Sequence, residues 1–170
     1  MIPLRLQMQN FLSYSGESPV LDLTGVRIAC LCGDNGHGKS ALLDAITWVL
    51  WGSARGRRYG QGGGSTDELV NQGHTETAVT LDLQVADSHY RVMRRYTRSG
   101  RSRQPSSILD LQIATGGGDY RSISEGSIGE TERRLRSILH MDYETFVSTA
   151  FLLQGQADRF TVSPPARRKE

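Results

Sequence analysis

A glycine-rich segment of eight residues, 33–40, constrains this chain more than any other feature. It reads Gly-Asp-Asn-Gly-His-Gly-Lys-Ser and fits the pattern G-x-x-x-x-G-K-[ST] at every fixed position. A mostly apolar run, residues 27–32, precedes it, and residues 39–51, which contain no glycine or proline, follow it. The sequence therefore predicts a strand covered on both faces, a glycine loop and a buried helix, which is the context that confirms this pattern.

The residue types in this loop suit phosphate binding. Glycines let backbone N–H groups point inward, and the N-terminus of the following helix adds its positive dipole end. Lys39, the only lysine before position 169, would reach the β- and γ-phosphates as the catalytic cation, and Ser40 would offer a hydroxyl to Mg²⁺. The predicted nucleotide-binding residues are Asn35, Gly36, His37, Gly38, Lys39, Ser40 and Ala41. The alternative is a glycine-rich turn that happens to precede a helix.

Hydrophobic periodicity predicts the elements around this loop. The expected strands are residues 2–9, 20–23 and 27–32, then two hairpins, 79–85 with 90–96 and 108–114 with 120–123. Ser127 and Glu130 form a capping box for a helix to residue 139, and Asp142 caps another that runs to about residue 151. Residues 53–64 predict a mobile loop. Cys30 and Cys32 are expected to be buried on one face of their strand, where they make poor disulfide partners.

A complete ATP-hydrolysing site also needs an acidic Mg²⁺ ligand at a strand end and a group that orients water. No apolar strand of four or more residues after the loop ends in such an acid, because residues 79–87 alternate and residues 108–110 are too few. Gln154, 115 positions after Lys39, lies in a Gln-Gly-Gln sequence that follows a largely apolar segment. Its amide oxygen suits Mg²⁺ and the attacking water, although propensity alone predicts only a helix that ends at a glycine.

The order of these features resembles the ABC-type ATPase head of the Rad50/SbcC double-strand-break repair family, relatives of the SMC proteins. Residues 6–14 resemble the family's opening strand and N-F-x-S segment, residues 33–46 its Walker A loop and helix, and residues 151–156 its Q-loop. The resemblance implies an α/β P-loop NTPase fold, with an antiparallel β subdomain. Residues 1–163 would form the N-terminal lobe of the head, and residues 164–170 would begin the helix that leads to a coiled coil.

The resemblance also implies a function. ATP and Mg²⁺ would be bound by Lys39, Ser40 and Gln154, with Gln156 left open as the metal ligand, and further nucleotide contacts would come from Ser13, Asn71 and Gln72. Walker B and signature motifs would come from a C-terminal half, and ATP would lie between two copies of the head. Head closure would be passed to a nuclease of the Mre11/SbcD type and to double-stranded DNA. Many members of that family carry a basic residue directly after the Asn-Phe pair, whereas this chain has Leu12 at that position.

Charge and composition say less. The net charge is +2, and eighteen of the twenty basic residues are arginines. Arg94, Arg95, Arg98, Arg101 and Arg103 form a cluster that predicts either DNA-phosphate contacts or a solvated hairpin face. No apolar stretch approaches the ~20 residues of a membrane span, so we expect no membrane partner and a cytoplasmic location.

Three alternatives stay open at this point. Another SMC-like or RecF-like head would differ from this family in the sequence between the glycine loop and the glutamine, and in its partner nuclease. A self-sufficient small P-loop kinase or GTPase would need its own acidic Mg²⁺ ligand and a substrate lid. A non-enzymatic, nucleotide-responsive interaction module would bind nucleotide without turnover.

Overall fold

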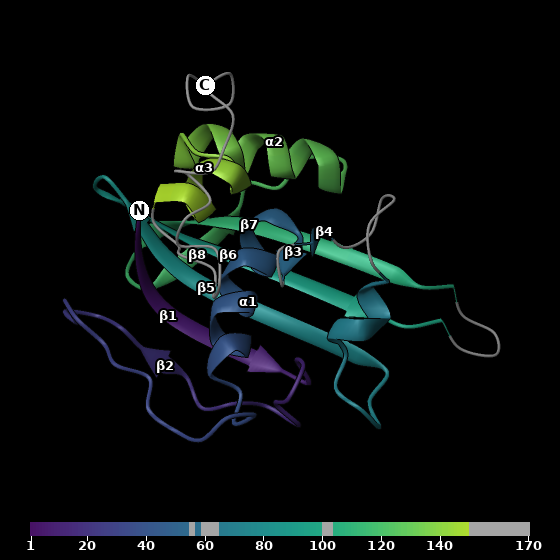
Figure 1. Cartoon of the computed structure of the whole chain (residues 1–170). Helices are drawn as coiled ribbons and strands as arrows, with labels where there is room; N and C mark the ends of the chain where they lie inside the picture. The colour runs from purple at the N-terminus through teal and green to yellow at the C-terminus, as the bar shows by residue number, and fades with distance from the viewer. Residues whose placement is uncertain (55–56, 59–64, 100–103, 150–170) are drawn as a thin grey trace, which may run out of the picture.

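The fold is built on a six-stranded antiparallel sheet with the strand order β2-β1-β5-β6-β7-β8 (Figure 1). The structure is a computed structural model and describes residues 1–54, 57–58, 65–99 and 104–149. The strands of the sheet are β1 (Ile2–Gln9), β2 (Leu21–Asp22), β5 (Glu76–Val85), β6 (Ser88–Thr97), β7 (Ser106–Gly116) and β8 (Asp119–Ser122).

Three helices lie on one face of this sheet: α1 (Lys39–Trp51), α2 (Ile128–Leu139) and α3 (Tyr143–Thr149) (Figure 1). A 3₁₀ helix, η1 (Thr66–Leu69), precedes β5, and two short strands, β3 (Ser53–Ala54) and β4 (Arg57–Arg58), pair with each other. None of the helices that the structure describes is long and apolar enough to cross a membrane.

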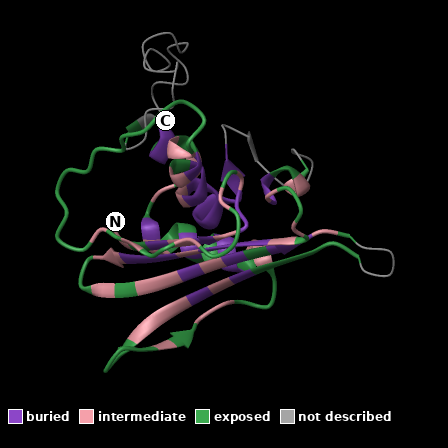
Figure 2. Cartoon of the chain, turned by 90° about the horizontal axis from the view of Figure 1, so that it is seen from below, coloured by how far each residue is buried: buried purple, intermediate pink, exposed green. Residues whose placement is uncertain are grey.

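The hydrophobic core lies between the helices and the sheet, where Figure 2 shows the buried residues gathered. Val79, Leu81 and Leu83 alternate along β5 and are all fully buried, as the period-two pattern predicts for a sheet with one covered face. Phe11 is also fully buried, and its ring lies 5.4 Å from that of Trp48 in α1. This packing joins the end of β1 to the helix that follows the glycine loop.

The local sequence signals place several elements correctly. The predicted helix 39–51 is α1, and the N–H of Gly52, at φ 66°, closes it on Trp48 O at 2.8 Å. Ser127 caps α2 by accepting from the Glu130 N–H at 3.2 Å, and Asp142 Oδ1 accepts from the Thr145 N–H at 2.8 Å before α3. Both predicted hairpins are present, as β5–β6 and β7–β8. Within residues 53–64, β3 and β4 pair where only a loop was expected.

The predicted strand at residues 27–32 is wrong. These residues form no strand and are exposed, with Ile28 at 92%. Cys30 and Cys32 are exposed rather than buried, with their sulfurs 3.7 Å apart and no disulfide. A strand needs a neighbour for its backbone groups, and no strand in the described part of the chain pairs with this segment. Figure 2 shows it as a green loop that stands away from the sheet.

Candidate nucleotide-binding site

The segment 33–40, which the sequence predicts to be a phosphate-binding loop, lies directly before α1. Gly36 and Gly38 have φ of 89° and 82°, in the left-handed region that glycine adopts without strain. The Lys39 ammonium turns back into the loop, where its Nζ donates to Gly33 O at 2.7 Å and to Asp34 O at 2.8 Å. These carbonyls hold the cation at the loop, and phosphate oxygens would be stronger acceptors for the same N–H groups.

The N-terminus of α1 is open towards this loop. Its capping residue, Gly38, makes no side-chain hydrogen bond, and the first turn contains no acidic residue. Ser40 is exposed in that turn, so its hydroxyl is accessible to a metal ion. His37 and Asp34 are also exposed, with 3.9 Å between the His37 ring nitrogen and the Asp34 carboxylate. The positive helix end and the ammonium therefore face the same space, which suits a polyphosphate.

The residues of the N-F-x-S segment lie against the loop. A Cβ on Gly38 would come within 2.8 Å of Ser13 Oγ and 3.0 Å of the Tyr14 ring. The Tyr14 hydroxyl lies 3.5 Å from Gly38 O, at the limit of a hydrogen bond. The sequence prediction included Ser13 but missed Tyr14. The signal that could have found Tyr14 was its position directly after Ser13 in the same segment. The two residues form one side wall of the loop.

Asn71 supports this wall through the backbone. Its Nδ2 donates to Leu12 O at 2.6 Å, and Leu12 N donates to Leu69 O at 2.8 Å. Asn71 is therefore bonded to the residue before Ser13, and its amide N–H is directed at the chain itself. Gln72, the next residue, is exposed. Gln154, Gln156 and the predicted helix start at residues 164–170 lie outside the described residues.

The arginine cluster divides into separate environments. Arg94 is buried, donates to Glu132 Oε1 at 3.0 Å and to Val49 O at 3.3 Å, and so is not available to DNA, contrary to the prediction. Arg98 is half-buried and bonded to backbone carbonyls. Arg95 is exposed. Arg101 and Arg103 lie outside the described residues.

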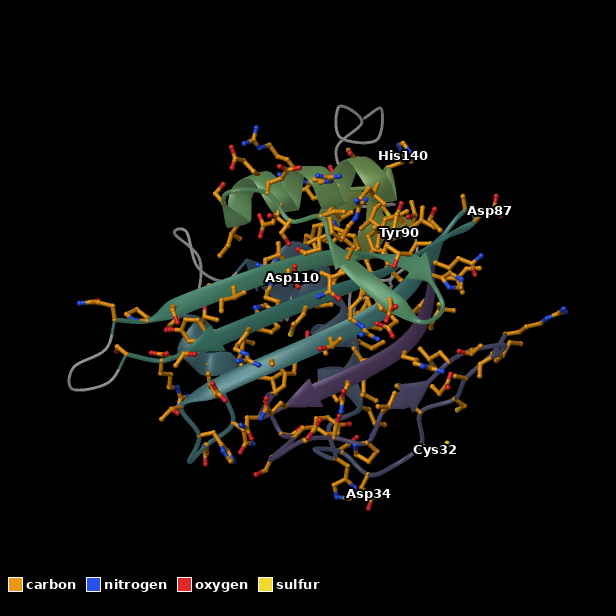
Figure 3. The ribbon with its side chains drawn as sticks, turned by 180° about the vertical axis from the view of Figure 1, so that it is seen from behind. Cys32, Asp34, Asp87, Tyr90, Asp110 and His140 are labelled. Carbon is orange, nitrogen blue, oxygen red and sulfur yellow. The ribbon has the colours of Figure 1, made fainter. Side chains whose placement is uncertain are left out.

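The open face of the sheet, away from the helices, is polar and largely paired. It is hollowed over about 660 Å³, and the hollow contains the Arg5–Asp22 pair at 3.5 Å and the Arg91–Asp82 pair at 2.6 Å. Burial acts to raise the pKa of Asp110 on β7, but hydrogen bonds from serine hydroxyls and an amide outweigh it and hold that pKa below its usual value. Figure 3 shows Asp110 on the sheet, apart from Cys32 and Asp34 beside the loop. These paired charges fit a solvated face.

A metal site made by protein side chains alone is not found: the described residues contain no group of three or more His, Cys, Asp or Glu side chains placed to hold an ion. The Ser40 hydroxyl, which the sequence predicts to be a metal ligand, is exposed at the start of α1.

Comparison with known proteins identifies the class. Residues 5–167 match the family described as AAA domain, so the chain belongs to this family of P-loop ATPase domains. Within it, the chain is similar to Rad50/SbcC proteins. It is 30% identical over 170 residues to the SbcC component of the nuclease SbcCD from Deinococcus radiodurans, covering 100% of this chain and 18% of that protein. It is 29% identical to the DNA double-strand break repair Rad50 ATPase of Thermoplasma volcanium, covering 100% of this chain and 17% of that protein.

The chain thus spans less than a fifth of the length of these relatives, at 18% and 17%. A solved structure of the recombination mediator protein RecF with ATP is more remote. It has a TM-score of 0.45 and 19% identity, and covers 65% of this chain and 26% of that one.

Proposed function

We propose that this chain is the ATP-binding N-terminal half of a DNA-repair ATPase head. The observation that carries the proposal is the loop at the start of α1, with the Lys39 ammonium inside it and the Ser40 hydroxyl beside it. The loop backbone and the helix end bind the phosphates, Lys39 neutralises the β- and γ-phosphates, and Ser40 and Gln154 hold Mg²⁺. Bound Mg²⁺ supplies neutralisation of the charge that develops as the terminal phosphate is cleaved.

A C-terminal half completes the catalytic site. Supporting this, Val26, Ile28 and Leu31 expose 48%, 92% and 41% of their surfaces beside the loop, and Leu43 of α1 exposes 39%. Exposed apolar surface next to a phosphate-binding loop favours a covering partner. The sequence also lacks an apolar strand that ends in an acidic Mg²⁺ ligand. We assign that ligand, and a strand that pairs with residues 27–32, to the other half.

We extend the proposal to the activity of the whole head by analogy with the relatives. Two heads close on ATP, and their closure regulates a nuclease of the Mre11/SbcD type during double-strand-break processing. Support comes from the relatives' names, which combine nuclease, ATPase and double-strand break repair. Double-stranded DNA is the nucleic-acid partner, with Arg95, Arg101 and Arg103 as the remaining phosphate-binding candidates, and the complex works in the cytoplasm.

ATP turnover tests this proposal. We expect turnover when this chain is mixed with the C-terminal half, and loss of turnover with Lys39→Ala. Lys169→Ala, a change at the chain's only other lysine, is the matched control and should leave turnover intact. Equal turnover by the chain alone would favour a self-sufficient P-loop enzyme. Nucleotide binding without turnover in the mixture would favour an interaction module.

A further inference from the structure

Arg98, the residue after β6, holds the segment 66–74 in place. Its Nη2 donates to Asp67 O at 2.6 Å and to Val70 O at 3.1 Å, and its Nη1 donates to His74 O at 3.1 Å. Its own backbone N–H donates to Thr75 O at 2.8 Å. One guanidinium therefore binds three carbonyls of a segment that has little regular structure of its own beyond η1.

The segment 66–74 in turn holds the segment 10–14. Phe11 bridges to Val70, and Asn71 N donates to Asn10 O at 2.8 Å. Leu12 is bonded on both sides, by Leu69 O and by the Asn71 amide. Leu12 has φ of 50°, a left-handed conformation that a leucine adopts only where its surroundings fix it.

The segment 10–14 then meets the phosphate-binding loop, because Ser13 and Tyr14 pack against Gly38. The contacts form a series from Arg98 through residues 66–74 and residues 10–14 to the loop. Every link in this series joins described residues of the chain, and the bonds of Arg98 go to neither Gly38 nor Lys39. The series ends at Gly38, on one side of the loop. It does not include the bonds that Lys39 makes to the carbonyls of Gly33 and Asp34.

We infer that Arg98 is a positioning residue for the sugar and base of the nucleotide, acting through the wall formed by Ser13 and Tyr14. The inference rests on the proposed nucleotide function and deepens it. The loop and Lys39 bind phosphates with their own backbone and ammonium groups. A nucleoside attached to those phosphates would extend past the loop, and Ser13 and Tyr14 lie against Gly38 at one side of it.

This position argues against the DNA contact that the sequence suggests for Arg98. Its two terminal nitrogens are directed at carbonyls of its own chain, and its side chain is 31% exposed. A DNA phosphate would have to compete with three such bonds. Arg121 is exposed on β8, at the opposite edge of the sheet from β2, and serves as the matched control.

The test compares two ligands, ATP and inorganic tripolyphosphate, by calorimetry on the chain with Arg98→Gln, Arg98→Lys or Arg121→Gln. We expect Arg98→Gln to weaken ATP binding by roughly tenfold, because the wall loses the guanidinium bonds that hold it in position. Tripolyphosphate affinity should stay within about twofold, since the loop is intact. Arg98→Lys should lose less ATP affinity than Arg98→Gln, and Arg121→Gln should change the affinity for neither ligand.

Three outcomes would overturn the inference. If both affinities fall together, Arg98 only stabilises the fold, and if neither falls, the wall does not touch the nucleoside. If the unmodified chain binds neither ligand, the proposed nucleotide-binding function fails together with the inference. Failure of the inference alone would instead leave ATP binding by the unmodified chain intact. Should Arg98→Gln not fold, Asn71→Ala removes a later link of the same series and must show the same loss for ATP alone.

Discussion

Replacing Glu132 by leucine tests how much the buried ion pair behind α1 contributes to stability. Arg94 and Glu132 have side chains that are only 8% and 11% exposed, and they join β6 to α2 with 3.0 Å between Arg94 Nη2 and Glu132 Oε1. Arg94 also donates to Val49 O in α1. Removing one partner of such a pair leaves an uncompensated buried charge, which costs about 3–5 kcal/mol. That is a large share of the roughly 5–15 kcal/mol by which a domain is stable.

Urea unfolding measures this loss, followed by the fluorescence of Trp48 and Trp51, the chain's two tryptophans. We expect Glu132→Leu and Arg94→Met each to lower the free energy of unfolding by about 3 kcal/mol or more. The double variant should cost less than the sum by about 2 kcal/mol, because no charge is left unpaired. Arg134→Met, which breaks the half-exposed pair with Glu125, should cost about 1 kcal/mol or less. Single losses below about 1 kcal/mol, or simple additivity, would refute the reasoning.

Three further predictions concern the loop, the exposed segment and alkaline pH. Gly38→Ala should weaken ATP binding by about tenfold or more in a binding titration, since its Cβ would meet Ser13 Oγ at 2.8 Å; Gly36→Ala, with similar φ but open space, should lose less. The thiols of Cys30 and Cys32 should react with iodoacetamide in the chain alone and be protected once the C-terminal half is added, as mass spectrometry can show; equal labelling would contradict docking at this segment. Burial, and then the hydrogen bond to Asp67, raise the pKa of Tyr96 to about 12, so its contribution to stability is full below pH 10.0 and is lost as pH rises through about 12; Tyr96→Phe should flatten that part of a pH–stability curve.

The sequence predicted those elements whose signals are local. The helix α1 satisfies its own backbone, so the run from Lys39 to Trp51 and the glycine after it were enough to set both ends. The hairpin β5–β6 needs only its own two strands and a short turn at Ala86, where φ is 49°. The cap of α2 joins Ser127 to the N–H of Glu130, only three positions further along the chain. In each case the hydrogen bonds that define the feature join residues that lie close in the chain, although β5 also pairs with β1.

The sequence predicted the loop of the candidate site, but it did not predict which neighbouring residues, such as Tyr14, pack against that loop. Lys39 and Ser40 follow from the motif, whereas the contact of Tyr14 with Gly38 depends on how residues 10–14 return to the loop. The arginine cluster shows the same limit more strongly. Arg94 and Arg95 are adjacent in sequence, but strand alternation turns Arg94 into the core beside Glu132 and leaves Arg95 exposed. A count of charges cannot distinguish the two, whereas the register of β6 can.

The wrong prediction at residues 27–32 and the right one at α1 have the same physical origin. A helix completes its hydrogen bonds within itself, whereas a strand takes its partners from other segments. The apolar side chains of this segment have the pattern of a core strand, yet Ile28 is 92% exposed because the described chain provides neither a paired edge nor a cover. If the proposed C-terminal half covers this run, it must supply a strand edge beside the loop and apolar side chains over it. An acidic residue at the end of that strand would stand next to Ser40, where the proposed Mg²⁺ site lacks its carboxylate.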